Sequence, residues 1–290
     1  MGSGWDDLEL DVVEGSDGRR LTTSISPMWE LAVVPQGGIV AAMAVRAMER
    51  VLNDPSQTLR TMTAMFAGQV AGGPVVIDVT VLRRGRTMSQ LTATVRNPDA
   101  EAGLTAIAAF GATRRAFEFT ELVMPDVAGP EGVRGFRDPL PDGIDFEWER
   151  DPFPFWAEVI ESRPVIGRPP WEDFEAGPGE VAYWYRFDDP PLTGDGSLDI
   201  AGAIVMCDTM PGSVGQKLGP DAGEWFAPSV DYTLHVFGPA PPGWLLAHMR
   251  ARHAGDGYAS IDCALWDPSG PDGPRLVAYA TQVMLFAFGR

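Results

Sequence analysis

The chain has 290 residues and 45% of them are hydrophobic, so it can bury a large core and has room for two units of about 150 residues. Its formal net charge of −18 argues against a surface that binds nucleic acid or an anionic membrane. The N-terminal sequence MGSGWDDLEL lacks a secretory signal and no apolar run is long enough to cross a bilayer, so we expect a cytoplasmic protein without membrane insertion.

The first predicted elements are an extended segment and a helix that begins with two glycines. Residues 21–26 read LTTSIS, and residues 37–52 read GGIVAAMAVRAMERVL. Glycines at the start and small residues along one side suit a helix that packs very close to a sheet. Residues 63–112 continue as apolar runs that stop at Gly and Pro, which predicts an antiparallel meander.

Residues 124–178 separate this unit from the next one and are rich in Pro, Gly and acidic residues. Residues 124–143 resemble a linker, and residues 147–167 are expected to dock on a domain or to line the mouth of a pocket. Two interpretations are open, a linker whose aromatic residues cover sheet surface and a lid over a substrate. The aromatic residues, which look exposed in the sequence, are Trp148, Phe153, Phe155, Trp156 and Trp171.

The second half of the chain repeats the order of the first. Residues 181–187 read VAYWYRF, and residues 201–210 read AGAIVMCDTM, a helix that we expect Pro211 and Gly212 to cut short. Residues 233–282 then align without a gap with residues 63–112, at a fixed offset of 170 residues. The matched Gly and Pro residues fall where the apolar runs stop, as in Gly68 and Gly238, Gly73 and Gly243, Gly85 and Gly255, and Pro98 and Pro268.

Strand, glycine-led helix and long antiparallel meander is the order of a hotdog domain. The sequence therefore predicts an α+β chain with a tandem hotdog fold, in which residues 5–123 and 179–290 are the two units and 124–178 link them. Their sheets should join side by side and mimic a hotdog dimer within one chain. We also expect the chain to form a homo-oligomer.

Several familiar kinds of catalytic site are absent from the sequence. It has no G-x-G-x-x-G, P-loop or G-x-S-x-G motif, and its three histidines, His235, His248 and His253, show no metal-binding spacing. The two cysteines, Cys207 and Cys263, lie in apolar contexts and should pack as small hydrophobic side chains. We therefore expect neither a cofactor nor a metal, and assign any chemistry to water or a carboxylate.

The two halves differ at two positions that bear on function. The offset that superposes Gly38 on Gly202 places Asp208 where the first helix has Ala44, and Gln282 replaces Ala112 in the last strand. A carboxylate on a helix packed against a sheet is costly to desolvate unless it is paired. Asp208 is therefore a candidate functional residue, although it could be a satisfied buried carboxylate or end a short helix, and Gln282 could simply bond an edge backbone group.

At these residues the chain resembles the double-hotdog acyl-CoA thioesterases, the family called thioesterase II. The resemblance implies that Asp208, Ser229 and Gln282 hold the water that attacks an acyl-CoA or acyl-carrier thioester. Ser229 stands where Thr is usual in that family, and Thr233 follows in the same segment. The segments that carry the resemblance are PQGGIVAAMAV, LRTMTAMFAGQVAGGPVVIDVTVLRRGRTM, MCDTMPGSVG, SVDYTLHVF and VAYATQVML.

Thioester hydrolysis also needs donors for the oxyanion and a place for the substrate. Backbone N–H groups at a helix N-terminus could serve the oxyanion, either those of Gly37 and Gly38 or those of Gly202 and Ala203. Arg83, Arg84 and Arg86 could meet the phosphates of coenzyme A or could form a turn of solvated charges. The acyl chain should lie between the helices, against side chains that could equally be plain core: Trp29, Met43, Phe66, Met206 and Met210.

Two other functions fit the predicted fold. Hotdog domains also include dehydratases and hydratases of acyl thioesters, which generally need a His beside the carboxylate, and no His occurs in the segment around Asp208. A non-catalytic acyl-binding protein is the second alternative, favoured if Asp208 pairs with an Arg.

Overall fold

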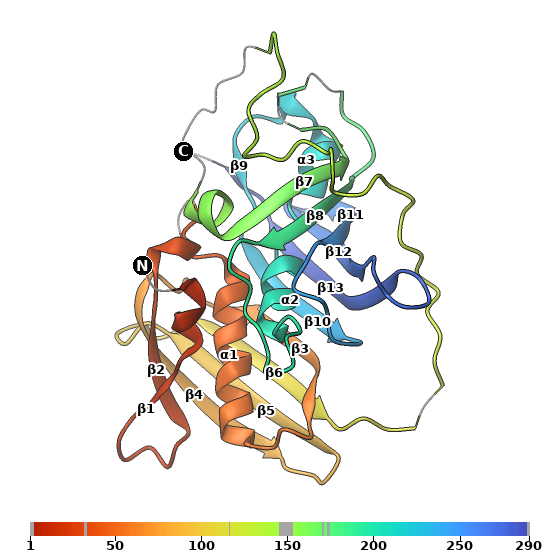
Figure 1. Cartoon of the computed structure of the whole chain (residues 1–290). Coiled ribbons are helices and arrows are strands. Elements are labelled where there is room, and N and C mark those ends of the chain that lie inside the picture. Colours follow the sequence, from red (N-terminus) through yellow and green to blue (C-terminus); the bar gives the residue numbers. More distant parts are fainter. Residues whose placement is uncertain are drawn as a thin grey trace.

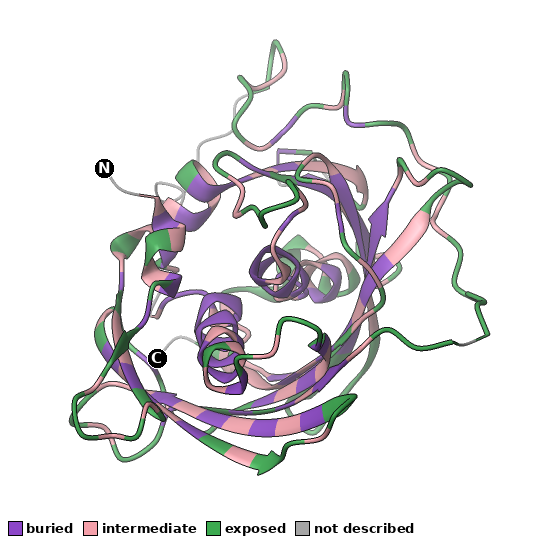
Figure 2. Cartoon of the chain, turned by 60° about the horizontal axis from the view of Figure 1, so that its bottom comes forward, coloured by how far each residue is buried: buried purple, intermediate pink, exposed green. Residues whose placement is uncertain are grey.

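One twelve-stranded sheet curves around two helices (Figures 1 and 2). The structure is a computed structural model that describes residues 3–31, 34–115, 117–144, 153–169, 171–172 and 175–288. Every strand pair in the sheet is antiparallel. The buried residues, coloured purple in Figure 2, include the helices and alternate positions of the strands that face them.

The N-terminal half contributes six strands and the longer helix. Its elements are β1 (Asp11–Val12), β2 (Arg20–Ile25), α1 (Gly37–Leu52), β3 (Thr58–Phe66), β4 (Gly73–Arg83), β5 (Met88–Arg96) and β6 (Leu104–Gly111). The C-terminal half contributes β7 (Ile160–Ile166), β8 (Glu180–Phe187), α2 (Ile200–Cys207), α3 (Gly212–Leu218), β9 (Trp225–Phe226), β10 (Ser229–Val236), β11 (Leu245–Gly255), β12 (Tyr258–Asp267), β13 (Arg275–Leu285) and β14 (Ala287–Phe288).

The strand order is symmetric about the centre of the sheet. It runs β1-β2-β4-β5-β6-β3-β10-β13-β12-β11-β8-β7, so β3 and β10 join the two halves, and each half repeats the other outward from this pair. Thr63 faces Thr233 in the β3–β10 register, and their hydroxyl oxygens are 2.9 Å apart. The two residues matched by the sequence repeat therefore meet at the centre of the sheet, and the tandem hotdog fold is confirmed.

Helix α1 forms because eleven of its residues can be buried while Gln36 satisfies its first turn. The Gln36 side chain accepts a hydrogen bond from the Ile39 N–H, and Asn53 ends the helix in a left-handed conformation with φ of 46°. The helix packs against α2 and against β4, β5 and β6. It runs antiparallel to α2, since Gly38 lies beside Val205 whereas Arg46 contacts Asp199 at the start of α2.

The second helix is shorter than the sequence predicted. It ends at Cys207, Asp208 follows as its C-cap with φ of −91° and ψ of 40°, and the chain turns before α3 begins at Gly212. Pro211 precedes α3 rather than ending α2, a position in which its missing N–H costs no helical hydrogen bond. Cys207 and Cys263 are free and buried, as expected for small hydrophobic side chains.

The segment between the halves covers and extends the sheet. Its strand β7 pairs with β8 as the last strand, so the C-terminal sheet begins before residue 179, where the sequence had placed the unit boundary. Met124 and Val127 pack against a second, smaller hydrophobic cluster that includes Trp184, whose indole N–H donates to the carbonyl of Ala128. These contacts support the interpretation in which the segment covers sheet surface rather than acting as a lid.

The aromatic residues of this segment are less exposed than their sequence context suggested. Phe155 is fully buried and packs against Trp29, and Trp171 is 8% exposed. Trp148 lies outside the described residues. Among the helices that the structure describes, none is long and apolar enough to cross a membrane.

Candidate active site

Asp208 lies where the end of α2 meets the beginning of α1. Gln282 Nε2 donates to its Oδ1 at 2.7 Å, and Gln36 Nε2 lies 3.1 Å from its Oδ2. The backbone N–H of Gly38, at the positive end of the α1 dipole, also bonds this carboxylate. Asp208 does end its helix, as one sequence interpretation supposed, and its partners are amide groups from both halves of the chain.

Ser229 reaches the same site because β10 contains a bulge. Ser229 and Tyr232 are three residues apart, so in a regular strand they would point to opposite faces. The register with β13 shifts between Ser229 and Asp231, which brings Ser229 to the inner face shared by Tyr232 and Gln282. Gln282 Nε2 lies 2.6 Å from Ser229 Oγ, whereas Thr233 points away and bonds Thr63. The structure thus brings Asp208, Ser229 and Gln282 together.

The electrostatics of the site favour a carboxylate that exchanges protons near neutral pH. Burial raises the pKa of Asp208 from its ordinary 3.8 to about 7, although the bonds from Gly38 and Gln282 act in the opposite direction. A base with such a pKa can both accept and release a proton at physiological pH. The Gln282 Oε1 atom is buried and has no protein hydrogen-bond partner among the described residues, so its lone pairs can accept from a bound water.

The two glycines at the start of α1 permit this close approach. A Cβ atom at Gly37 would lie 2.9 Å from Asp208 Oδ2 and 2.9 Å from the ring of Phe66. A Cβ atom at Gly38 would lie 2.9 Å from the Cα atom of Val205, which belongs to the backbone of α2. A larger residue at either position would displace the carboxylate, the ring or a helix.

Gly202 and Ala203, the second proposed pair of oxyanion donors, are not at this site. They lie in the first turn of α2, whereas Asp208 follows its last turn, and the Gly202 N–H donates to the Asp199 carbonyl at 2.9 Å. The sequence repeat made the two glycine-led helices equivalent, but their antiparallel packing brings only the start of α1 to Asp208.

The arginines proposed to meet coenzyme A phosphates lie near the end of α1 that is far from Asp208. Arg83 ends β4, Arg84 and Arg86 follow in the turn, and Arg84 Nη2 donates to the Val51 carbonyl at the last turn of the helix. Asp208 contacts the first turn of the same helix, and 16 residues of helix span about 24 Å. The three arginines are exposed. Because the pantetheine arm separates the thioester of an acyl-CoA from its phosphates, this distance does not decide between a phosphate contact and a turn of solvated charges, and the phosphate contact stays a prediction.

The residues proposed to line an acyl pocket are mostly in the core. Met43, Met206 and Met210 are at most 1% exposed, and Trp29 is fully buried with its indole N–H bonded to the Gly4 carbonyl. Phe66 is partly exposed and lies against Gly37, so it is the residue of this set that the structure brings next to Asp208. A pocket between the two helices remains a prediction.

Sequence reasoning missed Gln36, although a signal was present. A polar residue directly before the glycine pair of an apolar helix occupies the position of an N-cap, where a side-chain acceptor is expected. The structure adds what the sequence could not show, namely that the other end of this side chain reaches Asp208 across the two halves. No group of metal-binding residues occurs in the described parts of the chain.

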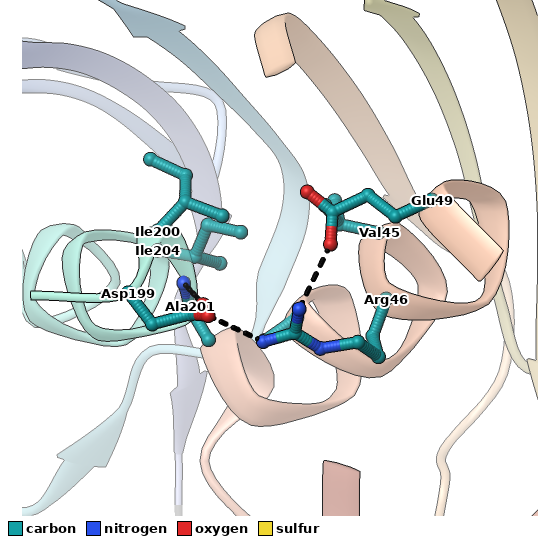
Figure 3. A pocket seen from close by; sticks show the side chains of 8 residues that line it. Val45, Arg46, Glu49, Asp199, Ile200, Ala201 and Ile204 are labelled. Carbon is teal, nitrogen blue, oxygen red and sulfur yellow. Dashed lines mark hydrogen bonds and ion pairs between the residues drawn. The ribbon is translucent and has the colours of Figure 1, made fainter. Parts of the chain in front are cut away.

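At the other end of the helix pair, an ion-paired cluster fills the space between α1 and α2 (Figure 3). Arg46 Nη2 lies 2.7 Å from Asp199 Oδ2, and Arg46 Nη1 lies 3.1 Å from Glu49 Oε2. This is the place that mirrors the Asp208 site, because here the start of α2 meets the last turns of α1. One end of the α1–α2 helix pair thus has a carboxylate surrounded by amide groups, Asp208, and the other end has an arginine between two carboxylates, Arg46.

Burial raises the pKa of Glu49 to about 7 against the attraction of Arg46, and repulsion from Asp199 adds to the rise. Because the pKa is higher in the folded state, the free energy of unfolding should fall as the pH rises from about 4.5 to 7. Glu49→Gln is therefore expected to increase the unfolding free energy by about 1–3 kcal/mol at pH 8 and to change it little at pH 5. Urea denaturation at both pH values measures this difference.

Glu161→Gln is the matched control for Glu49→Gln. Hydrogen bonds from Arg163 and Arg186 lower the pKa of Glu161 despite its partial burial, so its charge stabilises the fold above pH 4.5. This substitution should therefore destabilise the protein at pH 8. Equal effects of the two substitutions would contradict the assignment of a raised pKa to Glu49.

Comparisons with known proteins agree with the fold. The family model of the acyl-CoA thioesterase N-terminal domain matches residues 25–111, and that of the C-terminal domain matches residues 130–286. The search of curated proteins finds no match. The second match includes most of the segment between the halves, in keeping with the place of β7 in the C-terminal sheet.

Similar solved structures cover nearly the whole chain. A conserved protein of unknown function with a hot dog fold from Alicyclobacillus acidocaldarius is 26% identical, with a TM-score of 0.77 and 100% of both chains covered. A putative thioesterase from Novosphingobium aromaticivorans is 23% identical, with a TM-score of 0.72 and 96% of this chain and 98% of that chain covered. An acyl-CoA thioesterase II, TesB2, from Mycobacterium marinum is 20% identical, with a TM-score of 0.73 and 99% of both chains covered. With its two domains matched in order, this chain belongs to the acyl-CoA thioesterase family.

Proposed function

We propose that this protein hydrolyses acyl-CoA thioesters to the free acid and coenzyme A, through a water that Asp208 orients and deprotonates. The observation that carries the proposal is the contact chain from Asp208 to Gln282 to Ser229 at the start of α1. Membership of the acyl-CoA thioesterase family supports the reaction class. The carboxylate supplies the only ionisable oxygen in this chain of contacts, so it is the base.

In the proposed reaction, the water donates one proton to Asp208 while its oxygen forms a bond to the thioester carbonyl carbon. Gln282 Oε1 can accept a hydrogen bond from this water, and the Ser229 hydroxyl can donate one to it. The carbonyl oxygen becomes an oxyanion, and the N–H of Gly37 can stabilise it because the first amide of a helix has no partner within the helix. The carbon–sulfur bond then breaks, and the proton held by Asp208 neutralises the departing thiolate.

The histidines do not support a dehydratase or hydratase. His248 Nε2 lies 2.6 Å from Glu180 Oε1, and His235 Nδ1 lies 3.1 Å from the Thr61 hydroxyl, both in contacts away from Asp208. His253 is exposed at the end of β11. The hydrogen-bond partners of Asp208 are amides rather than an Arg, so the condition that favours a non-catalytic acyl-binding protein is also not met among the described contacts.

Steady release of free thiol from acyl-CoA is the expected result of an assay with acyl chains of graded length. The rate should rise with pH through about 7, because Asp208 acts as a base only when it is ionised and its pKa is about 7. A thiol reagent that absorbs on reaction follows the product continuously. Binding without thiol release would favour the acyl-binding protein, and water addition to enoyl-CoA without thiol release would favour the hydratase.

A further inference from the structure

Gln36 is buried between two helices from different halves of the chain. The side chain is 1% exposed, and a buried carboxamide is costly unless both of its ends are hydrogen-bonded. Its Oε1 accepts from the Ile39 N–H at 3.0 Å. Its Nε2 lies 3.1 Å from each of three acceptors, the Val205 carbonyl, the Asp208 carbonyl and Asp208 Oδ2. The amide therefore has more acceptors than its two hydrogens can serve at once.

The two ends of the Gln36 side chain form hydrogen bonds with backbone groups at two helix termini. The first N–H groups of α1 and the last carbonyl groups of α2 have no partners within their own helices. Gln36 accepts from the former and donates to the latter, so it fixes the start of α1 against the end of α2. Gly38 permits this distance, because its missing side chain leaves room for the backbone of Val205.

The position of Asp208 depends on hydrogen bonds from neighbouring elements, because this residue lies outside the regular part of α2. Its backbone N–H donates to the Val205 carbonyl at 3.2 Å, and a turn rather than a further helical residue follows it. Gln282 holds Oδ1 from β13, and Gln36 holds Oδ2 from the opposite side. Together with the Gly38 N–H, these two side chains restrict rotation of the carboxylate about its last bond.

We propose that Gln36 is a positioning residue for the hydrolysis, one that fixes the plane of the Asp208 carboxylate so that it faces the attacking water. The proposal rests on the assignment of Asp208 as the base in the proposed function. Gln36 acts through Asp208 and through the spacing of the two helices, without itself touching the substrate.

Gln36→Met tests this role because methionine keeps the length of the side chain and removes both hydrogen-bonding ends. The expected result is a fall of about tenfold or more in kcat with a smaller change in KM, since the loss affects the base rather than substrate binding. A donor to a carboxylate favours its charged form, so the acidic limb of the kcat/KM profile should move to higher pH. Tyr232 is the other titratable side chain packed near Asp208 from β10, and burial raises its pKa well above the ordinary value, so it stays neutral over this range.

Gln57→Met is the matched control. Gln57 is 5% exposed, and its Nε2 donates to Asp54 Oδ2 at 2.7 Å and to the Gly85 carbonyl at 3.0 Å, near the end of α1 far from Asp208. The Gln57→Met substitution removes a buried carboxamide of the same kind. It should lower stability without moving the acidic limb of the kcat/KM profile. If Gln36→Met and Gln57→Met change kcat and the acidic limb equally, Gln36 has only a structural role and the proposal is overturned.

A direct titration separates this proposal from the proposed function. Carbon-13 NMR of labelled aspartate carboxyl groups, with the Asp208 signal assigned by its loss in Asp208→Asn, gives the pKa of Asp208 without any substrate. An upward shift in Gln36→Met supports the positioning contact, and an unchanged pKa with a folded protein overturns it. Failure of the parent protein to hydrolyse any acyl-CoA would instead overturn the proposed function, and with it the role of Gln36 in hydrolysis.

Discussion

Replacing Asp208 with asparagine is expected to lower kcat/KM for acyl-CoA hydrolysis at least about a hundredfold. Asparagine keeps the shape of the side chain but cannot accept the proton of the attacking water. Stability should change little at pH 8. Removing a desolvated charge stabilises the fold above a pH of about 7, and this gain offsets the hydrogen bond from Gln282 or Gln36 that the asparagine NH2 group cannot accept. Steady-state thiol release and thermal unfolding at pH 8 measure the two effects on the same preparation.

Gln282→Ala and Ser229→Ala test whether these two residues act together with Asp208. Each should reduce activity less than Asp208→Asn, and each should add little when combined with it, because in the proposed mechanism all three side chains of this contact chain act on one water. Full additivity of the losses would show that the residues act independently. An Asp208→Asn protein as active as the parent would contradict the mechanism outright.

The tandem architecture was readable from the sequence because its signal is long and redundant. The pairing of Thr63 with Thr233 at the centre of the sheet follows from the repeat at an offset of 170 residues. The repeat is not gapless to its end, because Ile107 pairs with Thr63 whereas Thr281 pairs with Thr233, so β13 is displaced by four further residues relative to β6. The departures from that repeat also pointed to the candidate site, since Asp208 stands where the first helix has Ala44 and the structure places Asp208 in contact with Gln282. The register makes Ala108, and not Ala112, the counterpart of Gln282 in the first half. Asymmetry within a duplicated fold was therefore the most useful clue to function.

The sequence could not show features that depend on how distant segments meet. The bulge that turns Ser229 inward is visible only in the register with β13, and Gln36 acquires its second set of partners only when the two halves pack. The antiparallel helix pair separates Gly202 from Asp208, although the linear pattern gave the two glycine-led helices equal standing. Strand β7 was hidden because Pro164 interrupts it, which an edge strand tolerates.

Gly38→Ala is expected to cause a large loss of both stability and activity through a single methyl group. The added Cβ would lie 2.9 Å from the Cα atom of Val205, so the two helices must move apart. Overpacking of this kind costs about 1–3 kcal/mol, which outweighs the gain of at most about 1 kcal/mol from the higher helix propensity of alanine. Moving α1 also withdraws the Gly38 N–H and Gln36 from Asp208, so activity should fall at least about tenfold. Thermal unfolding and thiol release measure the two losses.

Gly202→Ala is the control that the duplicated fold itself provides, because Gly202 holds the repeat-equivalent place in α2. A Cβ atom there would meet the side chain of Leu198 at 2.9 Å, and a side chain can move where a backbone cannot. The change should therefore alter stability by less than about 1 kcal/mol and leave catalysis intact, since Gly202 lies at the other end of α2 from Asp208. If both alanine variants lose activity to the same degree, the close approach of Gly38 to Val205 is not what positions the Asp208 carboxylate, and the loss reflects packing of the helix pair as a whole.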